Sequence, residues 1–335
     1  MYTVVTGAAG FIGSNIVRAL NARGVIDIWA VDDLTDSAKI RNLVGCEIAD
    51  YFDKDEFLER LTAGDLNGEI TTVLHEGACS DTLETDGRYM LRNNYRYSVA
   101  LLDHCQDNDI PLLYASSGSV YGAGRVFVEK REYEAPLNAY GYSKWLFDQY
   151  VRRTLPERTV QIAGFRYFNV YGPREQHKGR MASVAFNFFN QYQEEGRVRL
   201  FEGSGGYGAG EQQRDFVYVD DVVAVNLYFL DHPEVSGIYN VGSGAAASFN
   251  SVAVATVNAC RTIAGEAPLT LAELLRQRAI EYIPFPAGLA DQYQNYTQAD
   301  LTALRASGYG APMRSAENAV PHYVESLISA AHARP

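Results

Sequence analysis

Three glycines near the start of the chain constrain its fold more than any other feature. Gly7, Gly10 and Gly13 stand in the segment G-A-A-G-F-I-G, between a β-branched run at 2–6 and apolar residues at helical spacing over 12–23. Such glycines permit a tight turn, a close approach of the backbone to a pyrophosphate, and close packing of helix on strand. The spacing is GxxGxxG instead of the usual GxGxxG, so the strand–turn–helix context carries the prediction of a dinucleotide site.

Further apolar runs repeat this pattern of strand and helix. Strands are expected at 26–34, 71–78, 110–117 and 160–173, with a helix over 89–106, and returns to the sheet at 214–230 and 237–244. Continuous apolar strands that alternate with helices indicate a parallel sheet covered on both faces. From residue 248 the chain is more helical, with one strand expected at 280–286.

These patterns predict an α/β fold, a Rossmann-type doubly wound parallel sheet with a smaller mixed α/β C-terminal substrate lobe. The NAD(P)-binding domain is expected over 1–168, with returns around 214–247. The substrate-binding lobe is expected over 169–213 and 248–335.

The overall charge and the cysteines exclude several kinds of partner. The 335 residues carry a net charge of −12, and an acidic chain repels nucleic acid. The four cysteines show no CxxC spacing, which indicates reduced thiols and no metal site: Cys46, Cys79, Cys105 and Cys260. The N-terminus lacks the features of a signal peptide, and no apolar run reaches the roughly 20 residues that a membrane span needs. We therefore expect a cytoplasmic protein without a membrane partner.

An aspartate after the second expected strand bears on the choice of dinucleotide. Asp32 follows the glycines by about 20 residues, a position that usually binds the adenosine ribose hydroxyls and favours NAD. Lys39 and Lys54 follow closely and could neutralise a 2′-phosphate, although a lone lysine is more often a solvated surface charge. The residues alone leave NAD and NADP open.

Two tyrosines and a lysine within residues 138–147, NAYGYSKWLF, suggest acid–base chemistry. Residues four apart share a helix face and residues two apart do not, so Tyr140 and Lys144 can act together while Tyr142 points elsewhere. A nearby ammonium and a positively charged nicotinamide both favour phenolate, and we expect Lys144 and the cofactor together to lower the pKa of Tyr140. Ser117 ends an expected strand and would donate a hydrogen bond to the same substrate oxygen. An isolated Y-x-x-x-K would more often be a packing pair with a surface lysine, but here it accompanies the glycine loop and SSGSVYG.

Together, TGAAGFIGSN, YASSGSVYG, YGYSK and FRYFNVYGPRE resemble the extended short-chain dehydrogenase/reductase family over nearly the whole chain. Members act mostly on nucleotide-sugars, as epimerases, dehydratases or reductases. The resemblance implies that Ser117, Tyr140 and Lys144 form a catalytic triad. It also implies one tightly bound NADP per subunit, or NAD as the alternative, and a homo-oligomer, a homopentamer by this resemblance.

Residues 171–183, YGPREQHKGRMAS, and 75–80, HEGACS, are similar to the members that invert C6 of an ADP-linked heptose for lipopolysaccharide. This similarity implies transient oxidation at C6 and reduction of the ketone on its opposite face. One base cannot easily serve the hydroxyls of both epimers, so Tyr140 would serve one and Lys178 the other. A desolvated lysine near a positive cofactor has a lowered pKa. By the residues alone, Lys178 could equally steady a diphosphate or lie exposed.

Matching positions imply the remaining contacts. The cofactor set is Gly7, Gly10, Phe11, Ile12, Gly13, Asp32, Asp33, Lys39, Lys54, Glu76, Gly77, Ala78, Cys79, Ser80, Asn93 and Lys144. The substrate set is Ser117, Asn169, Arg180, Asn187, Phe201, Glu202, Gly203, Ser204, Arg214 and Tyr293. Arg214 would clamp a diphosphate bidentately, with a surface salt bridge as the alternative.

This chain departs from the family pattern at several positions. Arg180 and Asn187 stand where other members carry serine and histidine, and the glycine-rich stretch 205–212 is longer than in some relatives. Asp33 replaces a frequent asparagine and adds a negative charge where a 2′-phosphate would lie. The alternatives are another nucleotide-sugar epimerase, such as a UDP-hexose 4-epimerase, or a non-catalytic dinucleotide sensor. A 4,6-dehydratase is less expected, because no Asp-Glu pair follows Ser117.

Overall fold

The computed structural model describes residues 1–286 and 294–332. The chain forms two compact units. The first unit comprises Met1–Tyr167, Val222–Val241 and Asp300–Gly310, and the second unit comprises Phe168–Asp221, Gly242–Ala299 and Ala311–Pro335. The units differ from the predicted boundaries at residue 168 and at three stretches. Residues 168, 214–221 and 242–247 belong to the second unit, and 300–310 belong to the first.

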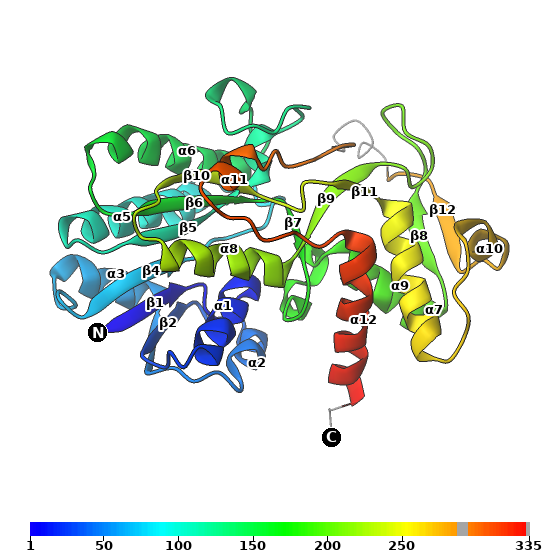
Figure 1. Cartoon of the computed structure of the whole chain (residues 1–335), viewed down its shortest axis with the longest axis horizontal. Coiled ribbons are helices and arrows are strands. Elements are labelled where there is room, and N and C mark those ends of the chain that lie inside the picture. The colour runs from blue at the N-terminus through cyan, green and yellow to red at the C-terminus, as the bar shows by residue number, and fades with distance from the viewer. Residues whose placement is uncertain (287–293, 333–335) are drawn as a thin grey trace. The chain divides into compact units, whose positions relative to one another are not determined.

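A seven-stranded parallel sheet forms the centre of the first unit (Figure 1). Its strand order is β10-β6-β5-β4-β1-β2-β3, and every neighbouring pair is parallel. The strands are β1 (Tyr2–Thr6), β2 (Ile28–Asp32), β3 (Asp50–Asp53), β4 (Ile70–His75), β5 (Leu112–Ser117), β6 (Ile162–Tyr167) and β10 (Gly237–Val241). The order reverses between β1 and β4, which is where ligands bind in such sheets. The predicted Rossmann-type fold is confirmed.

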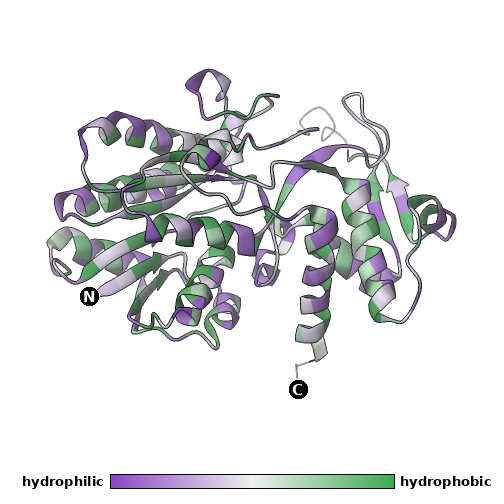
Figure 2. Ribbon diagram, viewed as in Figure 1, coloured by the Kyte–Doolittle hydropathy of each residue, from purple (hydrophilic) through white to green (hydrophobic). Residues whose placement is uncertain are grey.

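Helices of the first unit cover this sheet and bury its side chains. They are α1 (Phe11–Ala22), α2 (Ile40–Leu43), α3 (Lys54–Ala63), α4 (Gly87–Met90), α5 (Tyr97–Asp107), α6 (Ala139–Thr154), most of α8 (Val219–Asp231) and α11 (Thr302–Ala306). A π-helical turn at Leu91–Arg96 joins α4 to α5. Strands β2, β5 and β6 are buried at every position, as a sheet with helices on both faces requires. These strands are largely hydrophobic in Figure 2.

The second unit has two small sheets and a helical core. A three-stranded sheet has the order β11-β9-β7, and β12 pairs with β8. The strands are β7 (Asn169–Tyr171), β8 (Val198–Phe201), β9 (Gln213–Tyr218), β11 (Ala246–Ser248) and β12 (Ile280–Ile283). The helices are α7 (Val184–Glu195), α9 (Phe249–Ile263), α10 (Leu271–Arg276) and α12 (Ala316–His332). Phe188 of α7, Val257 of α9 and Val324 of α12 meet in one buried cluster.

Two predicted elements differ from the structure. The expected strand at 160–173 is two strands in different sheets, β6 and β7, which separate at Phe168. The expected return at 214–230 is β9 of the small sheet followed by α8, whose first turn carries Asp220 and Asp221 near the positive helix end. Neither the short β3 nor α3 was among the predicted residue ranges. The return at 237–244 and the strand at 280–286 are confirmed as β10 and β12.

Within the described residues, no helix combines the length and apolar character that a membrane span needs.

Candidate active site

The glycine loop lies between β1 and α1 and leaves no room for side chains. Gly7 has a φ of 66°, and a Cβ there would lie 2.7 Å from the Gly77 nitrogen. A Cβ on Gly13 would lie 2.2 Å from the Gly7 carbonyl oxygen. The Gly10 amide donates to that carbonyl at 2.9 Å, and α1 begins at the next residue. The cradle and the positive helix end fit the pyrophosphate of a dinucleotide.

Charged groups of both signs gather where β2 ends. Asp32 accepts from the Ala9 amide through Oδ2 at 2.8 Å, and its Oδ1 lies 2.8 Å from the Lys39 ammonium. Lys54 donates to Asn93 at 3.1 Å and lies 3.9 Å from the Asp33 carboxylate. Hydrogen bonds from Thr35, together with both lysines, hold the pKa of Asp33 below its usual value. Both lysines therefore lie beside carboxylates at this edge of the sheet and are not isolated surface charges.

The structure brings Ser117, Tyr140 and Lys144 together. Ser117 ends β5, and its side chain lies close enough to the Tyr140 phenol to lower the pKa of that group. Asn138 starts α6 by accepting from the Gly141 amide at 2.8 Å, which orients the turn that carries Tyr140. Lys144 is buried one turn later and donates to the Ala115 carbonyl of β5 at 2.7 Å.

The pKa values of this group correct one prediction. Burial raises the pKa of the Tyr140 phenol, whereas the hydrogen bond with Ser117 lowers it. Burial also lowers the pKa of Lys144 to about 8, although the charges of Glu76 and Asp148 raise it. In the chain alone the pKa of Tyr140 is therefore raised and not lowered, and Lys144 is not among the groups that shift it. The Lys144 ammonium is bonded instead to the Ala115 carbonyl of β5. The prediction also depended on the positive charge of a bound nicotinamide, and that part stays a prediction.

Tyr142 lies apart from this group, as predicted. Its side chain is 44% exposed and stacks on Trp145, with ring centroids 5.4 Å apart. The helical spacing thus correctly separates the two tyrosines.

A buried carboxyl group follows β4, and sequence reasoning identified Glu76 only as a cofactor contact. Tyr167 donates to its Oε1 at 3.0 Å, and Asn226 donates to the Tyr167 oxygen at 2.8 Å. Burial raises the pKa of Glu76 to about 7, although Tyr167 and Lys144 lower it. A carboxyl group directly after an apolar strand was the signal in the sequence.

An asparagine that was not predicted for the site, Asn94, is hydrogen-bonded to the segment 77–80. This segment is the remainder of the predicted cofactor segment after β4. Asn94 accepts from the Cys79 amide at 2.8 Å and donates to the Cys79 carbonyl at 2.9 Å. It also donates to Ser143 of α6 at 3.1 Å. A single amide side chain therefore joins this segment to the helix that carries Tyr140 and Lys144.

Lys178 belongs to the second unit, in a short 3₁₀ segment at Gln176–Met181 between β7 and α7. Burial lowers the pKa of its ammonium, whereas the charge of Glu175 raises it. The predicted direction of this pKa shift is confirmed. Arg180 lies exposed in the same segment.

Arg214 is buried on β9, with 7% of its surface exposed, which excludes the alternative of a surface salt bridge. It donates to the Gln213 carbonyl at 3.0 Å and lies over the Phe249 ring at 5.7 Å. Asn169 is exposed on β7, and Asn187 of α7 donates to the Ala182 carbonyl at 3.2 Å.

The predicted segment Phe201–Ser204 follows β8. Phe201 stacks on Phe285 with centroids 4.6 Å apart, and Ser204 donates to Asn295 at 2.7 Å. Glu202 and Gly203 are exposed. The predicted residue Tyr293 lies outside the described residues.

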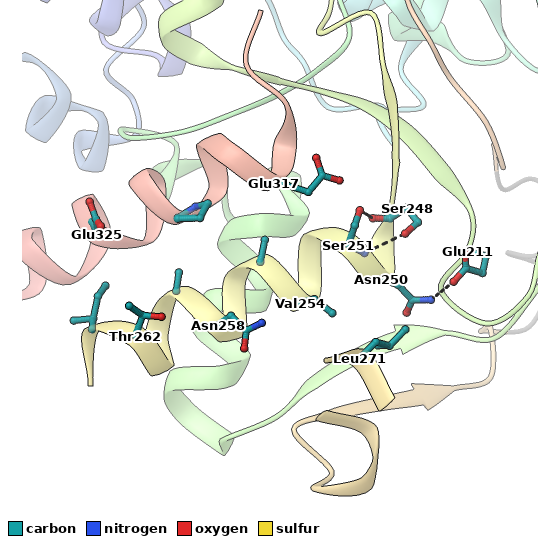
Figure 3. Close-up of a pocket in the computed structure, with 14 residues that line it drawn as sticks. Glu211, Ser248, Asn250, Ser251, Val254, Asn258, Thr262, Leu271, Glu317 and Glu325 are labelled. Atoms are coloured by element: carbon teal, nitrogen blue, oxygen red, sulfur yellow. Dashed lines mark hydrogen bonds between the residues drawn. The ribbon is translucent and has the colours of Figure 1, made fainter. Parts of the chain in front are cut away.

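The glycine-rich stretch 205–212 is tied to the start of α9. Asn250 donates to the Ala209 carbonyl at 3.0 Å. It also donates to the Glu211 carboxylate at 2.5 Å (Figure 3). A cavity of about 590 Å³ lies along α9 at this point, lined among others by Val254, Leu271 and Glu317. Its described lining contains no residue that we predicted for the site.

Comparisons with known proteins agree with this geometry. The model of the NAD dependent epimerase/dehydratase family matches residues 3–242. The ADP-L-glycero-D-manno-heptose-6-epimerase of Thiobacillus denitrificans is 65% identical over 327 residues, which are 98% of each chain. The crystal structure of the Helicobacter pylori ADP-L-glycero-D-manno-heptose-6-epimerase has a TM-score of 0.81 at 27% identity and covers 98% of this chain and 96% of that chain.

A UDP-glucose 4-epimerase of Thermus thermophilus, solved with NAD, has a TM-score of 0.75 at 26% identity. It covers 98% of this chain and 100% of that chain. The glycine cradle and the grouped serine, tyrosine and lysine lie within the stretch that the family model matches. The chain belongs to the NAD dependent epimerase/dehydratase family.

Proposed function

We propose that this chain interconverts ADP-D-glycero-D-manno-heptose and ADP-L-glycero-D-manno-heptose by transient oxidation at C6. The observation that carries the proposal is the 65% identity to a heptose epimerase over nearly the full length of both chains. A product of this reaction would supply heptose for the lipopolysaccharide core. The proposal makes the chain an isomerase that acts on a nucleotide-sugar.

The residues of the first unit would bind the cofactor and move one proton. The glycine loop and the start of α1 fit the pyrophosphate, and Lys144 would hold the nicotinamide ribose. When bound, the nicotinamide supplies hydride chemistry, accepting a hydride from C6 and returning it to the opposite face. Tyr140 would take the proton of the C6 hydroxyl, with Ser117 donating a hydrogen bond to the same oxygen. Because burial raises the pKa of Tyr140, the positive charge of a bound cofactor would favour its phenolate form.

Lys178 would serve the second epimer. The ketone must present its other face, and the two alcohols then place their hydroxyl groups differently, so a single base serves both poorly. Burial lowers the pKa of Lys178, which favours a neutral amine that can accept a proton near neutral pH. Arg214 would bind the diphosphate, because a buried guanidinium pairs with phosphate oxygens in two places.

Of the two dinucleotides, we propose NADP. Lys39 pairs with Asp32 at the end of β2, where the adenosine ribose usually binds, and Lys54, the first residue of α3, lies 3.9 Å from Asp33. Two ammonium groups there suit a 2′-phosphate. Asp33 opposes this preference with its own charge. Removal of either lysine tests the proposal, as described below.

Product analysis tests the proposed reaction. Purified enzyme with its cofactor is incubated with one ADP-heptose epimer, and the stereochemistry at C6 is followed by NMR. UDP-galactose serves as the matched substrate for a 4-epimerase. We expect a mixture of C6 epimers from ADP-heptose and unchanged UDP-galactose. Inversion of UDP-galactose alone would favour the 4-epimerase, and tight cofactor binding without turnover would favour a sensor.

We also propose a homo-oligomeric assembly, a homopentamer by the family resemblance, located in the cytoplasm. Light scattering of the purified full-length chain measures the assembly directly. A mass of one or two chains would contradict the pentamer.

A further inference from the structure

The connection from β7 to α7 is a closed loop with a buried carboxylate at its base. Glu175 is completely buried. Its Oε1 accepts from the Gly172 amide at 3.2 Å and from the Ser183 hydroxyl at 2.7 Å, and its Oε2 accepts from the Ser183 amide at 2.5 Å. Gly172 and Ser183 are the two ends of the connection, so one side chain closes an Ω-type loop. Lys178 lies in the middle of this loop.

The backbone around Lys178 is tied to the same glutamate. The Lys178 amide donates to the Glu175 carbonyl at 2.9 Å. Two residues with positive φ flank this hydrogen-bonded turn. Arg174, before it, has a φ of 77°, and Gly179, after it, has a φ of 51°. A non-glycine residue such as Arg174 keeps that conformation only where the surrounding structure determines it. The Glu175 carboxylate, on the next residue, accepts three hydrogen bonds from the two ends of the loop.

Glu175 is also an electrostatic partner of Lys178. Burial raises the pKa of Glu175, whereas its bonds with Ser183 and Gly172 and the charge of Lys178 lower it. In return, Glu175 raises the pKa of Lys178 against the effect of burial. From α12, Tyr323 faces the same carboxylate, and burial and Glu175 both raise the pKa of its phenol.

From this geometry we infer that Glu175 is a positioning residue for Lys178, one that fixes the place of the amine and stabilises its ammonium form. The inference rests on the proposed role of Lys178 as the second base. A buried carboxylate could also have a purely structural role, as Asp215 in the same unit illustrates. Asp215 is completely buried and accepts from the amides of Ser243, Gly244 and Ala299.

Glu175→Gln tests the inference, because it keeps the size of the side chain and removes its charge. The chain contains only five lysines, so the titration of each ammonium is measurable by NMR with labelled lysine, and Lys178→Met identifies the Lys178 signal. We expect Lys178 to lose its proton at lower pH in Glu175→Gln than in the unchanged chain. We also expect kcat to fall by about tenfold to a hundredfold, with the matching limb of the pH profile at lower pH.

Asp215→Asn is the matched control for the loss of a buried, loop-closing carboxylate. It is expected to lower stability and to leave the titration of Lys178 unchanged. An equal shift of Lys178 in Asp215→Asn, or unchanged titration and kcat in Glu175→Gln, would overturn the inference. If Glu175→Gln does not fold, Ser183→Ala decides, since it removes the 2.7 Å bond and keeps the charge. A kcat equal to that of the unchanged enzyme in Ser183→Ala would then overturn the inference.

The measurements separate this inference from the proposed function. Full activity in Lys178→Met would reject the two-base reaction, whatever Glu175 does. A shifted Lys178 titration in Glu175→Gln, together with an active Lys178→Met, would support the contact between the two residues and reject the role of the amine.

Discussion

Two tyrosines that are two residues apart in α6 have different surroundings, and this difference predicts their roles. The phenol of Tyr140 lies beside the Ser117 side chain, whereas the side chain of Tyr142 is 44% exposed and stacks on Trp145. We expect Tyr140→Phe to lower kcat by at least about a hundredfold, because a general base is lost, while the cofactor stays bound. Tyr142→Phe is the control and should keep kcat nearly unchanged. Steady-state kinetics and cofactor content measure both, and a large loss in Tyr142→Phe would contradict the assignment.

Glu76 should make stability depend on pH. Its pKa in the folded chain is about 7, above the ordinary 4.5, so its contribution is fully present below about pH 4.5 and is lost as pH rises through 7. Glu76→Gln cannot ionise and keeps an oxygen for Tyr167. We expect its free energy of unfolding, relative to the unchanged chain, to rise between pH 5 and pH 8 by up to about 3 kcal/mol.

Denaturant unfolding of the cofactor-free chain at both pH values measures this difference. Glu59→Gln on the exposed face of α3 is the control and should show no change with pH. A difference for Glu76→Gln that does not vary with pH would contradict a raised pKa.

The lysines at the end of β2 predict the preference for NADP. Lys39→Ala and Lys54→Ala should each weaken NADP binding by about tenfold, because a charge-assisted contact with the 2′-phosphate is lost. NAD binding should change much less. Titration of the stripped enzyme with each dinucleotide measures both affinities, with the exposed Lys130→Ala as control. Equal losses for NAD and NADP would reject the 2′-phosphate contact.

At the scale of elements, the junction of β1 and α1 depends on the absence of a side chain. Gly13→Ala would place a Cβ 2.2 Å from the Gly7 carbonyl oxygen, so the helix must move away from the loop. We expect a loss of stability of about 1–3 kcal/mol and weaker dinucleotide binding. Gly87→Ala at the start of α4 meets nothing within 4 Å and is the control. Unfolding and dinucleotide titrations compare the two variants, and unchanged binding in Gly13→Ala would contradict the cradle.

The elements that sequence reasoning missed share a physical cause. Residues 160–173 read as one apolar strand, but β6 and β7 pair with strands of different sheets. Residues 219–231 are apolar enough for a strand, yet they form α8. In both cases the segments against which the run pairs or packs lie far away in the chain. An apolar run by itself is compatible with a buried strand or with a buried helix.

At the scale of the whole molecule, the proposed reaction returns its hydride, so the cofactor is required and not consumed. Enzyme stripped of its dinucleotide should have no epimerase activity and a lower Tm, because a ligand that binds only the folded state stabilises it. Added NADP should restore both without accumulation of reduced cofactor. Activity assays, absorbance at the reduced-nicotinamide band and thermal unfolding measure this outcome. Epimerisation by fully stripped enzyme would contradict the mechanism.

The sequence by itself determined the dinucleotide loop and the separation of Tyr140 from Tyr142. Both are local, since turns and helix faces depend on residues within about four positions of one another. The tertiary structure alone decided the burial of Glu76, the bond from Lys144 to Ala115, and the closure of the Lys178 loop by Glu175. Burial and pKa depend on which distant segments cover a side chain, and spacing along the chain does not contain that information.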